Sequence, residues 1–433
     1  MFILWGFVNI LSDYQRNLGS AYYPRMNQVL VLNKSAYTDI LMGLLCIVLF
    51  IFVNPFVALF FLAIIARTYR IPAFIFIVSA SISFALFFYF REYGVAWDPS
   101  STDDVPVYIN FYNMNESIGF WGIFVRFIAV PSGYEPLWNI LWWPLINIFG
   151  ASNNVFVFLH YTLIFVAVFF SFFILSRKYF ITLALVYFFI APMSIDSITH
   201  IWRQQLAFSL FLIGIGYYLV HGNTKGKWLI YISPLMHLSS IFFVAVFLVF
   251  ELYKKYAGFD NRIKFATITG LIFVTLPIMS SVVISYLSSI GVPKIAGYFE
   301  GSGDDRSRIF LRVSIVVILL LILHLKLISD DLNNFFIITL LAVFSFMFAF
   351  PGSNSIYDRF LMFSLPFFGL YLFRCFLINF SVRWHLLIIL FVFVTGAIRI
   401  YIPTLNDVGA VRFLANGHAF DPFMGSLKML IYL

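Results

Sequence analysis

Apolar runs of about 20 residues recur along most of the chain, separated by short polar segments. A helix of about 20 apolar residues crosses the ~30 Å hydrocarbon layer of a bilayer, so each run predicts a transmembrane helix. The predicted spans are 41–66, 73–90, 154–175, 180–193, 202–220, 265–287, 309–327, 333–350, 358–374 and 384–402. The pattern therefore predicts an all-α polytopic integral membrane protein with about ten full transmembrane helices.

Basic residues indicate how these helices are oriented. Lysine and arginine gather in the short loops at 67–70, 177–178, 225–227, 254–264 and 374–383. Short basic loops stay on the cytoplasmic side of a membrane. The segments expected outside are then the N-terminus, 91–153, 194–201, 288–308, 351–357 and the C-terminal tail.

The apolar stretch 228–250 does not fit this scheme as one straight span. It has basic residues on both sides, Lys227 before it and Lys254 after it, so a single crossing would put one of them on the wrong side. Pro234 also removes a helical hydrogen bond in its middle. We therefore expect a broken or re-entrant helical segment near 228–250, whose irregular turn lines a cavity.

The outer segment 91–153 is the only large loop between the predicted spans. It contains "GFWGIFVRFIAV" and "EPLWNILWWPLINIFG", which are rich in tryptophan and too short to cross a bilayer. Such stretches lie in the membrane interface, so we expect interfacial helices here. The domain organisation predicted is an N-terminal interfacial segment 1–40, a transmembrane domain 41–402 and a C-terminal tail 403–433.

Composition excludes several classes of protein. Apolar residues fill 62% of the 433 positions and charged residues 11%, whereas roughly a quarter of the residues in a soluble domain are charged. The net charge of +8 lies mostly in short loops that set orientation, so it does not indicate nucleic-acid binding. Cys46 and Cys375 stand inside apolar runs, which argues against a disulfide framework or a thiolate site. We expect no metal and no cofactor.

Polar side chains collect at the outer end of one predicted helix, in "SITHIWRQQLAFSLFLIGIGYYL". If the helix starts near Asp196, then Asp196, His200 and Arg203 share one helical face, and the stripe continues through the small residues Ala207 and Gly214. Small residues let another helix or a lipid chain approach closely. Asp196 could simply cap the helix, with His200 and Arg203 as headgroup anchors. The alternative is a site for an anionic group, because an arginine facing a membrane bundle is a functional candidate.

Two more polar clusters lie on the same predicted side. In "PGSNSIYDRFLMF", Asp358 and Arg359 are either a local pair that eases insertion or part of a phosphate clamp. The second cluster follows a predicted span, and its members are Arg91, Asp103, Asp104, Tyr108 and Tyr112. Carboxylates beside aromatic rings suit carbohydrate, since acids bind hydroxyls and rings stack on the apolar sugar face. A solvated acidic loop is the alternative for this cluster.

Together these motifs resemble the EpsG-like branch of the Wzy polymerases, which join lipid-linked oligosaccharide repeats into O-antigen or exopolysaccharide. The motifs are Arg91 with its acidic loop, Glu135-Pro136, "WRQQLAFSLFL", "HLSSIFF" and "YDRFLMF". Arg203 with Gly214 eleven positions later is also similar to the Arg-x10-Gly element of Wzy outer loops. After Arg359 the glycine is out of register, because Gly369 follows ten positions on.

The resemblance implies a multi-pass enzyme of the bacterial inner membrane whose active site faces the periplasm. Its donor would be a glycan on undecaprenyl pyrophosphate, its acceptor the non-reducing-end sugar of another lipid-linked repeat, and a Wzz-like chain-length regulator a partner. Arginines would hold the leaving diphosphate, and the candidates are Arg203, Arg359 and Arg91. The candidates for the catalytic base are His200, Asp196, His237 and Glu135. The expected sugar-binding residues are Asp103, Asp104, Tyr108, Tyr112 and Asp358.

Other functions share some of these features. His237 is equally well explained as a core histidine whose ring nitrogens are hydrogen-bonded or as a residue that binds a ligand. A GT-C glycosyltransferase that uses a polyprenyl-phosphate sugar would also employ outer-loop acids, and an O-antigen ligase would use the same donor. A flippase or transporter of lipid-linked sugars needs a basic cavity too, but it would be expected to show matched halves, and no internal repeat is evident. The polymerase is the function that the motifs favour.

Overall fold

The computed structural model describes residues 29–89, 105–129, 135–190, 201–256, 275, 330–349, 367, 369–374 and 385–396. Within these ranges all regular structure is helical, which confirms the all-α prediction for this part of the chain. One helix within these ranges, Asn153–Leu175, has the length and apolar character needed to cross a membrane. The ten crossings therefore stay a prediction, and the spans 265–287 and 309–327 lie almost wholly outside the described residues.

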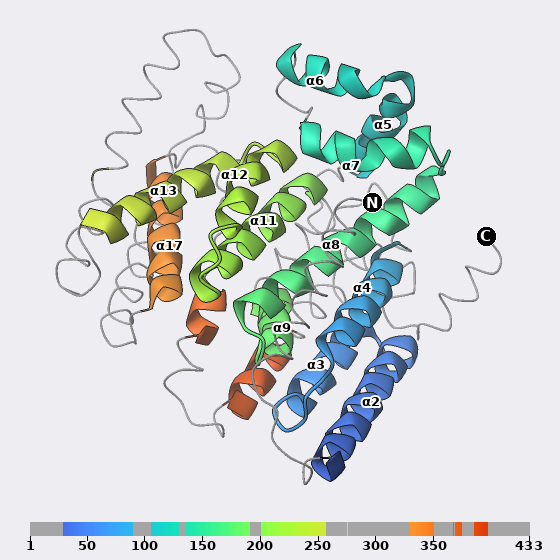
Figure 1. The fold of residues 1–433 in the computed structure, drawn as a ribbon, viewed down its shortest axis with the longest axis vertical. Coiled ribbons are helices and arrows are strands. Elements are labelled where there is room, and N and C mark those ends of the chain that lie inside the picture. The colour runs from blue at the N-terminus through green and yellow to red at the C-terminus, as the bar shows by residue number, and fades with distance from the viewer. Residues whose placement is uncertain are drawn as a thin grey trace.

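Helix α8 forms the centre of the described helices, with α4 packed on one side and α11 on the other (Figure 1). Helix α12 packs on α11, and α5 and α7 lie across one end of α8. The bounds are α2 Val29–Phe52, α3 Pro55–Ile65, α4 Ala73–Tyr89, α5 Val105–Met114, α6 Phe120–Ala129, α7 Pro136–Asn147, α8 Asn153–Leu175, α9 Phe180–Ile190, α11 Trp202–Ile215, α12 Gly226–Met236, α13 Ser240–Tyr256 and α17 Asp331–Ala349. A 3-10 turn, η2, spans Asn115–Ser117, and the π-helical η3 spans Gly216–Val220.

The predicted single span 41–66 is wrong, because two helices occupy it. Helix α2 runs through the predicted boundary at residue 40 and ends at Phe52, and α3 begins at Pro55. The Asn54 side chain accepts a hydrogen bond from the backbone N–H of Phe56, and proline at the first helical position lacks only an N–H that would have no partner there. The Asn-Pro pair is thus a helix start that the hydropathy of this stretch conceals.

The stretch 228–250 is broken, as predicted, and doubles back on itself. Helix α12 ends at Met236, two residues after Pro234, and α13 begins at Ser240. Lys227 forms an ion pair with Glu251, 24 positions further along the chain. A straight helix would hold these residues ~36 Å apart at 1.5 Å per residue. Helices α12 and α13 therefore form a hairpin that brings its two ends together.

Helices α11 and α12 approach each other most closely at two glycines. A Cβ atom added to Gly214 would lie 2.8 Å from the carbonyl oxygen of Gly226, and one added to Gly226 would lie 2.5 Å from that of Gly214. Glycine is therefore required on both sides of this contact. The small residue at Gly214 admits another helix, and its place in the Arg-x10-Gly pattern is explained by this packing.

We expect Gly214→Ala to lower the free energy of unfolding by about 1–3 kcal/mol, because backbone atoms cannot move aside. Gly43→Ala is a matched control: its added Cβ would meet the Ile75 Cδ1 methyl at 2.7 Å, a group that can rotate away. Alanine there also gains about 1 kcal/mol of helix propensity. Thermal unfolding in detergent measures both variants, and equal losses would contradict a backbone-limited contact between α11 and α12.

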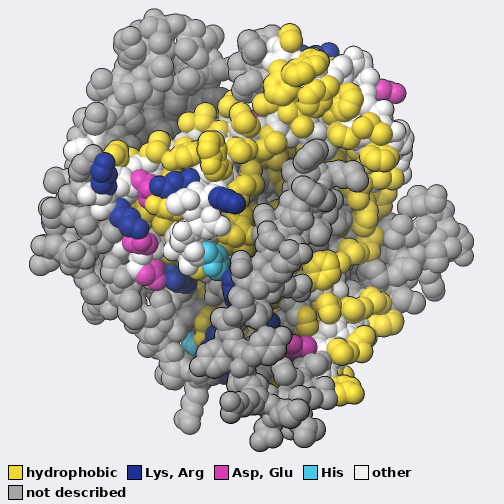
Figure 2. Space-filling view, viewed as in Figure 1, with side chains coloured by type: hydrophobic (Ala, Val, Ile, Leu, Met, Phe, Trp, Pro, Cys, Tyr) yellow, Lys and Arg dark blue, Asp and Glu magenta, His cyan; other side chains and the backbone are white. Residues whose placement is uncertain are grey.

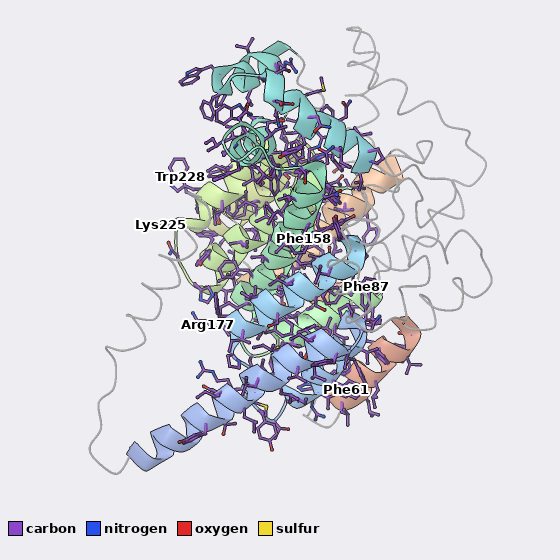
Figure 3. The ribbon with its side chains drawn as sticks, turned by 90° about the vertical axis from the view of Figure 1, so that its right-hand side faces the viewer. Phe61, Phe87, Phe158, Arg177, Lys225 and Trp228 are labelled. Carbon is purple, nitrogen blue, oxygen red and sulfur yellow. The ribbon has the colours of Figure 1, made fainter. Side chains whose placement is uncertain are left out.

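Large apolar side chains are exposed on the outside of the helices. Trp228 is 70% exposed and Phe61 is 46% exposed, and both are labelled in Figure 3. Figure 2 shows hydrophobic side chains over much of the described surface around α5, α6 and α7, while charged side chains gather near the C-terminal end of α13. Apolar surface on this scale is typical of a protein that contacts lipid.

Candidate functional site

Glu135 stands immediately before α7 and is 3% exposed. Its side chain makes no capping hydrogen bond to the helix. Its backbone carbonyl oxygen accepts a hydrogen bond from Asn139 Nδ2 at 2.9 Å, and Pro136 begins the helix. The backbone of Glu135 is therefore fixed by α7, while its carboxylate points to partners on other helices.

The first of these partners is Arg203, the second residue of α11. Its Nη1 donates to Glu135 Oε2 in an ion pair that joins residues 68 positions apart. The Arg203 side chain is 14% exposed. Its guanidinium carbon lies 5.3 Å from the ring centre of Tyr108 and 5.2 Å from that of Phe111, both on α5. Cation–π contacts of this kind hold the guanidinium plane in place.

The second partner is His237, at the turn of the α12–α13 hairpin. Its Nε2 lies 3.9 Å from Glu135 Oε1. The backbone N–H of Ser239 donates to His237 Nδ1 at 3.3 Å, so in the neutral ring the proton is assigned to Nε2, which faces the carboxylate. The two oxygens of Glu135 thus face different groups, Oε2 the arginine and Oε1 the histidine.

Burial is the main influence on the charge of Glu135, which lies in the loop 91–153 outside the predicted spans. Loss of solvation raises the pKa of this carboxyl, the positive charge of Arg203 and the hydrogen bonds lower it, and burial prevails. Arg203 is therefore the main group that opposes the effect of burial on the pKa of this carboxyl. Anything that draws Arg203 away would make Glu135 a stronger proton acceptor.

The two described tyrosines of the predicted sugar-binding set pack against protein. Tyr108 is 2% exposed and stacks on Trp202, with ring centres 5.1 Å apart. Tyr112 is fully buried, stacks on Phe156 at 4.2 Å and donates its hydroxyl to the carbonyl oxygen of Ala151 at 2.8 Å. Both lie on one face of α5, and that face is turned to the core. Both rings are buried against protein in this structure, and their role in sugar binding stays a prediction.

The other predicted site residues lie outside the described residues, and their roles stay predictions. They are Asp196, His200, Arg91, Asp103, Asp104, Asp358 and Arg359. Within the described part of the chain, no group of three or more His, Cys, Asp or Glu side chains is placed to hold a metal ion.

Two aromatic neighbours of the site were not singled out by the sequence. Trp202 is fully buried and precedes Arg203, and His160 on α8 stacks on Trp202 with ring centres 4.4 Å apart. A single imidazole inside the apolar run "NNVFVFLHYTLIF" was the available signal for His160. Nothing in that run indicates which helix it would face.

The fold and the site define an all-helical protein in which the buried carboxylate of Glu135 meets the half-buried side chains of Arg203 and His237 between helices. The sequence model of the EpsG family matches residues 93–413, and the chain belongs to this family. No curated protein and no solved structure matches the chain. Family membership confirms the resemblance noted in the sequence and makes the chain a membrane protein of polysaccharide biosynthesis with a polymerase-like function. The matched range includes Glu135, Arg203 and His237.

Proposed function

We propose that the protein is a polysaccharide polymerase of the bacterial inner membrane whose site faces the periplasm. It transfers a glycan from undecaprenyl pyrophosphate to the non-reducing-end sugar of another lipid-linked repeat unit. The observation that carries this proposal is the contact of Arg203 with Glu135, beside His237. A cation for a diphosphate and an acceptor for a hydroxyl proton lie in direct contact, as glycosyl transfer from a diphosphate requires.

The reaction needs little more than these two groups. An acceptor hydroxyl oxygen forms a bond to the anomeric carbon of the donor, and the bond between that carbon and the pyrophosphate oxygen breaks. The hydroxyl proton passes to the base, and undecaprenyl pyrophosphate leaves with the bonding electron pair. The guanidinium stabilises the negative charge that gathers on the leaving diphosphate, where paired N–H donors fit phosphate oxygens.

Glu135 is the base that the geometry favours. In the neutral tautomer assigned to His237, the ring presents a proton to Glu135 and has no acceptor atom on that side. The carboxylate Oε1 accepts protons and is bound less closely than Oε2, which pairs with Arg203. His237 then serves as a donor that steadies the carboxylate, after an approach of roughly 1 Å into hydrogen-bonding range.

An exchange of partners at Arg203 links donor binding to proton transfer. An incoming diphosphate competes with Glu135 for the guanidinium, because both are anions that suit its paired N–H groups. Once Arg203 turns to the diphosphate, Glu135 loses the group that lowers its pKa, and burial then raises the pKa further. The base becomes stronger only when the donor is in place.

Loss of the gene should leave cells with lipid A-core that carries a single repeat unit, since ligation proceeds while polymerisation does not. Electrophoresis of the extracted lipopolysaccharide measures the number of repeat units on lipid A-core. Cells that carry the intact gene on a plasmid are the control. Absence of any repeat from the outer leaflet would identify flipping as the function. Full-length polymer that stays on the lipid carrier would identify ligation, and intact wild-type glycan would rule out all of these functions. A Wzz-like chain-length regulator is the proposed protein partner.

A further inference from the structure

The first turn of α11, which carries Arg203, has no side-chain cap. Ile201 precedes the helix and makes no capping hydrogen bond, although such caps ordinarily hold the first N–H groups of a helix. The position of Arg203 must therefore be fixed by other contacts. The residue between Ile201 and Arg203 is Trp202, which is fully buried.

Trp202 is held in a column of rings, defined here as Tyr108, Trp202 and His160. The Tyr108 and Trp202 rings are 5.1 Å apart and inclined by 11°, and the Trp202 and His160 rings are 4.4 Å apart and inclined by 24°. Tyr161 meets Trp202 edge-on at 4.9 Å. The guanidinium of Arg203 lies over Tyr108, so the column runs from α8 to the candidate site.

His160 is an unexpected residue at the inner end of this column. It is fully buried on α8, and neither of its ring nitrogens has a hydrogen-bond partner. Burying such groups without partners costs free energy that a leucine would not incur. The ring centres of Trp142 and Trp138 lie 4.9 and 6.0 Å away, so His160 is enclosed by flat side chains. A planar ring can stack on these neighbours, whereas a branched side chain of similar volume fills the space without stacking.

We infer that His160 is a positioning residue of the proposed polymerase: its flat ring supports Trp202, and the ring column sets where Arg203 lies relative to Glu135. His160 is enclosed by the core and acts through Trp202 and Tyr108. The inference rests on the proposed function for its activity measurement. It concerns α8, a helix to which the sequence motifs assign no role in the site.

His160→Leu separates positioning from stability. Leucine fills the space without unpaired polar atoms, so thermal stability in detergent should be kept or raised. The polymerisation rate should nevertheless fall at least about tenfold, because displacements on the order of 1 Å at a catalytic group are costly. His160→Phe restores a flat ring and should recover most of the rate. A wild-type rate in His160→Leu, or equal losses in both variants, would overturn the inference.

Coupling to Arg203 gives the second measurement. Because His160 acts through Arg203, adding His160→Leu to the Arg203→Lys variant should lower the polymerisation rate by less than about threefold. Phe169→Leu is the control: Phe169 is buried on the same helix and has no ring contact with Trp202. Its effects on the rate should multiply with those of Arg203→Lys. If His160→Leu lowers the polymerisation rate about tenfold in both the wild-type protein and the Arg203→Lys variant, His160 acts independently of Arg203 and the inference is overturned.

A third measurement does not depend on the reaction. Glu135→Cys and Arg203→Cys, in a chain lacking Cys46 and Cys375, should be joined by a short reagent with two thiol-reactive groups, which alkylates both cysteines. His160→Leu should lower the yield several-fold and His160→Phe should not. If the wild-type protein fails to polymerise but the yields follow this order, the proposed function fails and the positioning role stands. Unchanged yields would overturn the positioning role whatever the activity.

Discussion

Arg203→Ala should abolish polymerisation, and Arg203→Lys should lower its rate by roughly ten- to a hundredfold, with both proteins inserted at near wild-type levels. Lysine keeps the charge but loses the planar fork that binds two phosphate oxygens at once. A charge-assisted hydrogen bond contributes about 1.5–3 kcal/mol. Loss of one such bond in the transition state corresponds to that range of rates.

The structure adds a reason why alanine is the worse substitution. Arg203→Ala leaves the carboxylate of Glu135 buried without its cation, whereas lysine still supplies one. A purified assay on undecaprenyl-pyrophosphate repeats measures rate and polymer length. Arg126→Lys, in the last turn of α6, is the matched control and should keep nearly full activity. Full rate and length from Arg203→Lys would leave Arg203 as a headgroup anchor, for which lysine serves equally well.

Much of this site could be predicted one residue at a time, because each member stands out from its surroundings. Arg203 opens an apolar helix, Glu135 lies in a Glu-Pro pair, and His237 follows a proline that breaks a helix. Their contact could not be predicted, because it joins a loop, a helix start and a hairpin turn. The doubled-back form of 228–250 was predictable from its basic flanks, and it is this form that brings His237 back to Glu135.

The features that the sequence did not reveal have two physical causes. Hydropathy averages over a window, so the helix start at Asn54 and Pro55 disappeared within an apolar run. Helical periodicity identifies which residues share a face but not what that face meets, so the burial of the Tyr108 and Tyr112 rings in the core could not be predicted. His160 escaped notice for the same reason, since its partners come from other helices.

Glu135→Gln should lower the polymerisation rate by about 10²- to 10⁴-fold, the usual contribution of a general base. The amide has nearly the same shape and still accepts a hydrogen bond from Arg203, but it cannot take up the proton. The base must be ionised to work, so the rate of the wild-type enzyme should fall as the pH falls through the pKa of Glu135. Burial raises that pKa, so this acid limb should lie above the ordinary glutamate value of about 4.3.

Donor affinity distinguishes this role from a purely structural one. If Glu135 only held Arg203 in place, Glu135→Gln would weaken binding of the lipid diphosphate. Under the exchange of partners proposed above, the carboxylate competes with the donor for the guanidinium, so the variant should bind the donor at least as tightly as the wild type while kcat falls. Binding of undecaprenyl pyrophosphate and single-turnover rates measure the two quantities separately. Weaker binding with an unchanged kcat would remove Glu135 as the base and leave it as a support for Arg203.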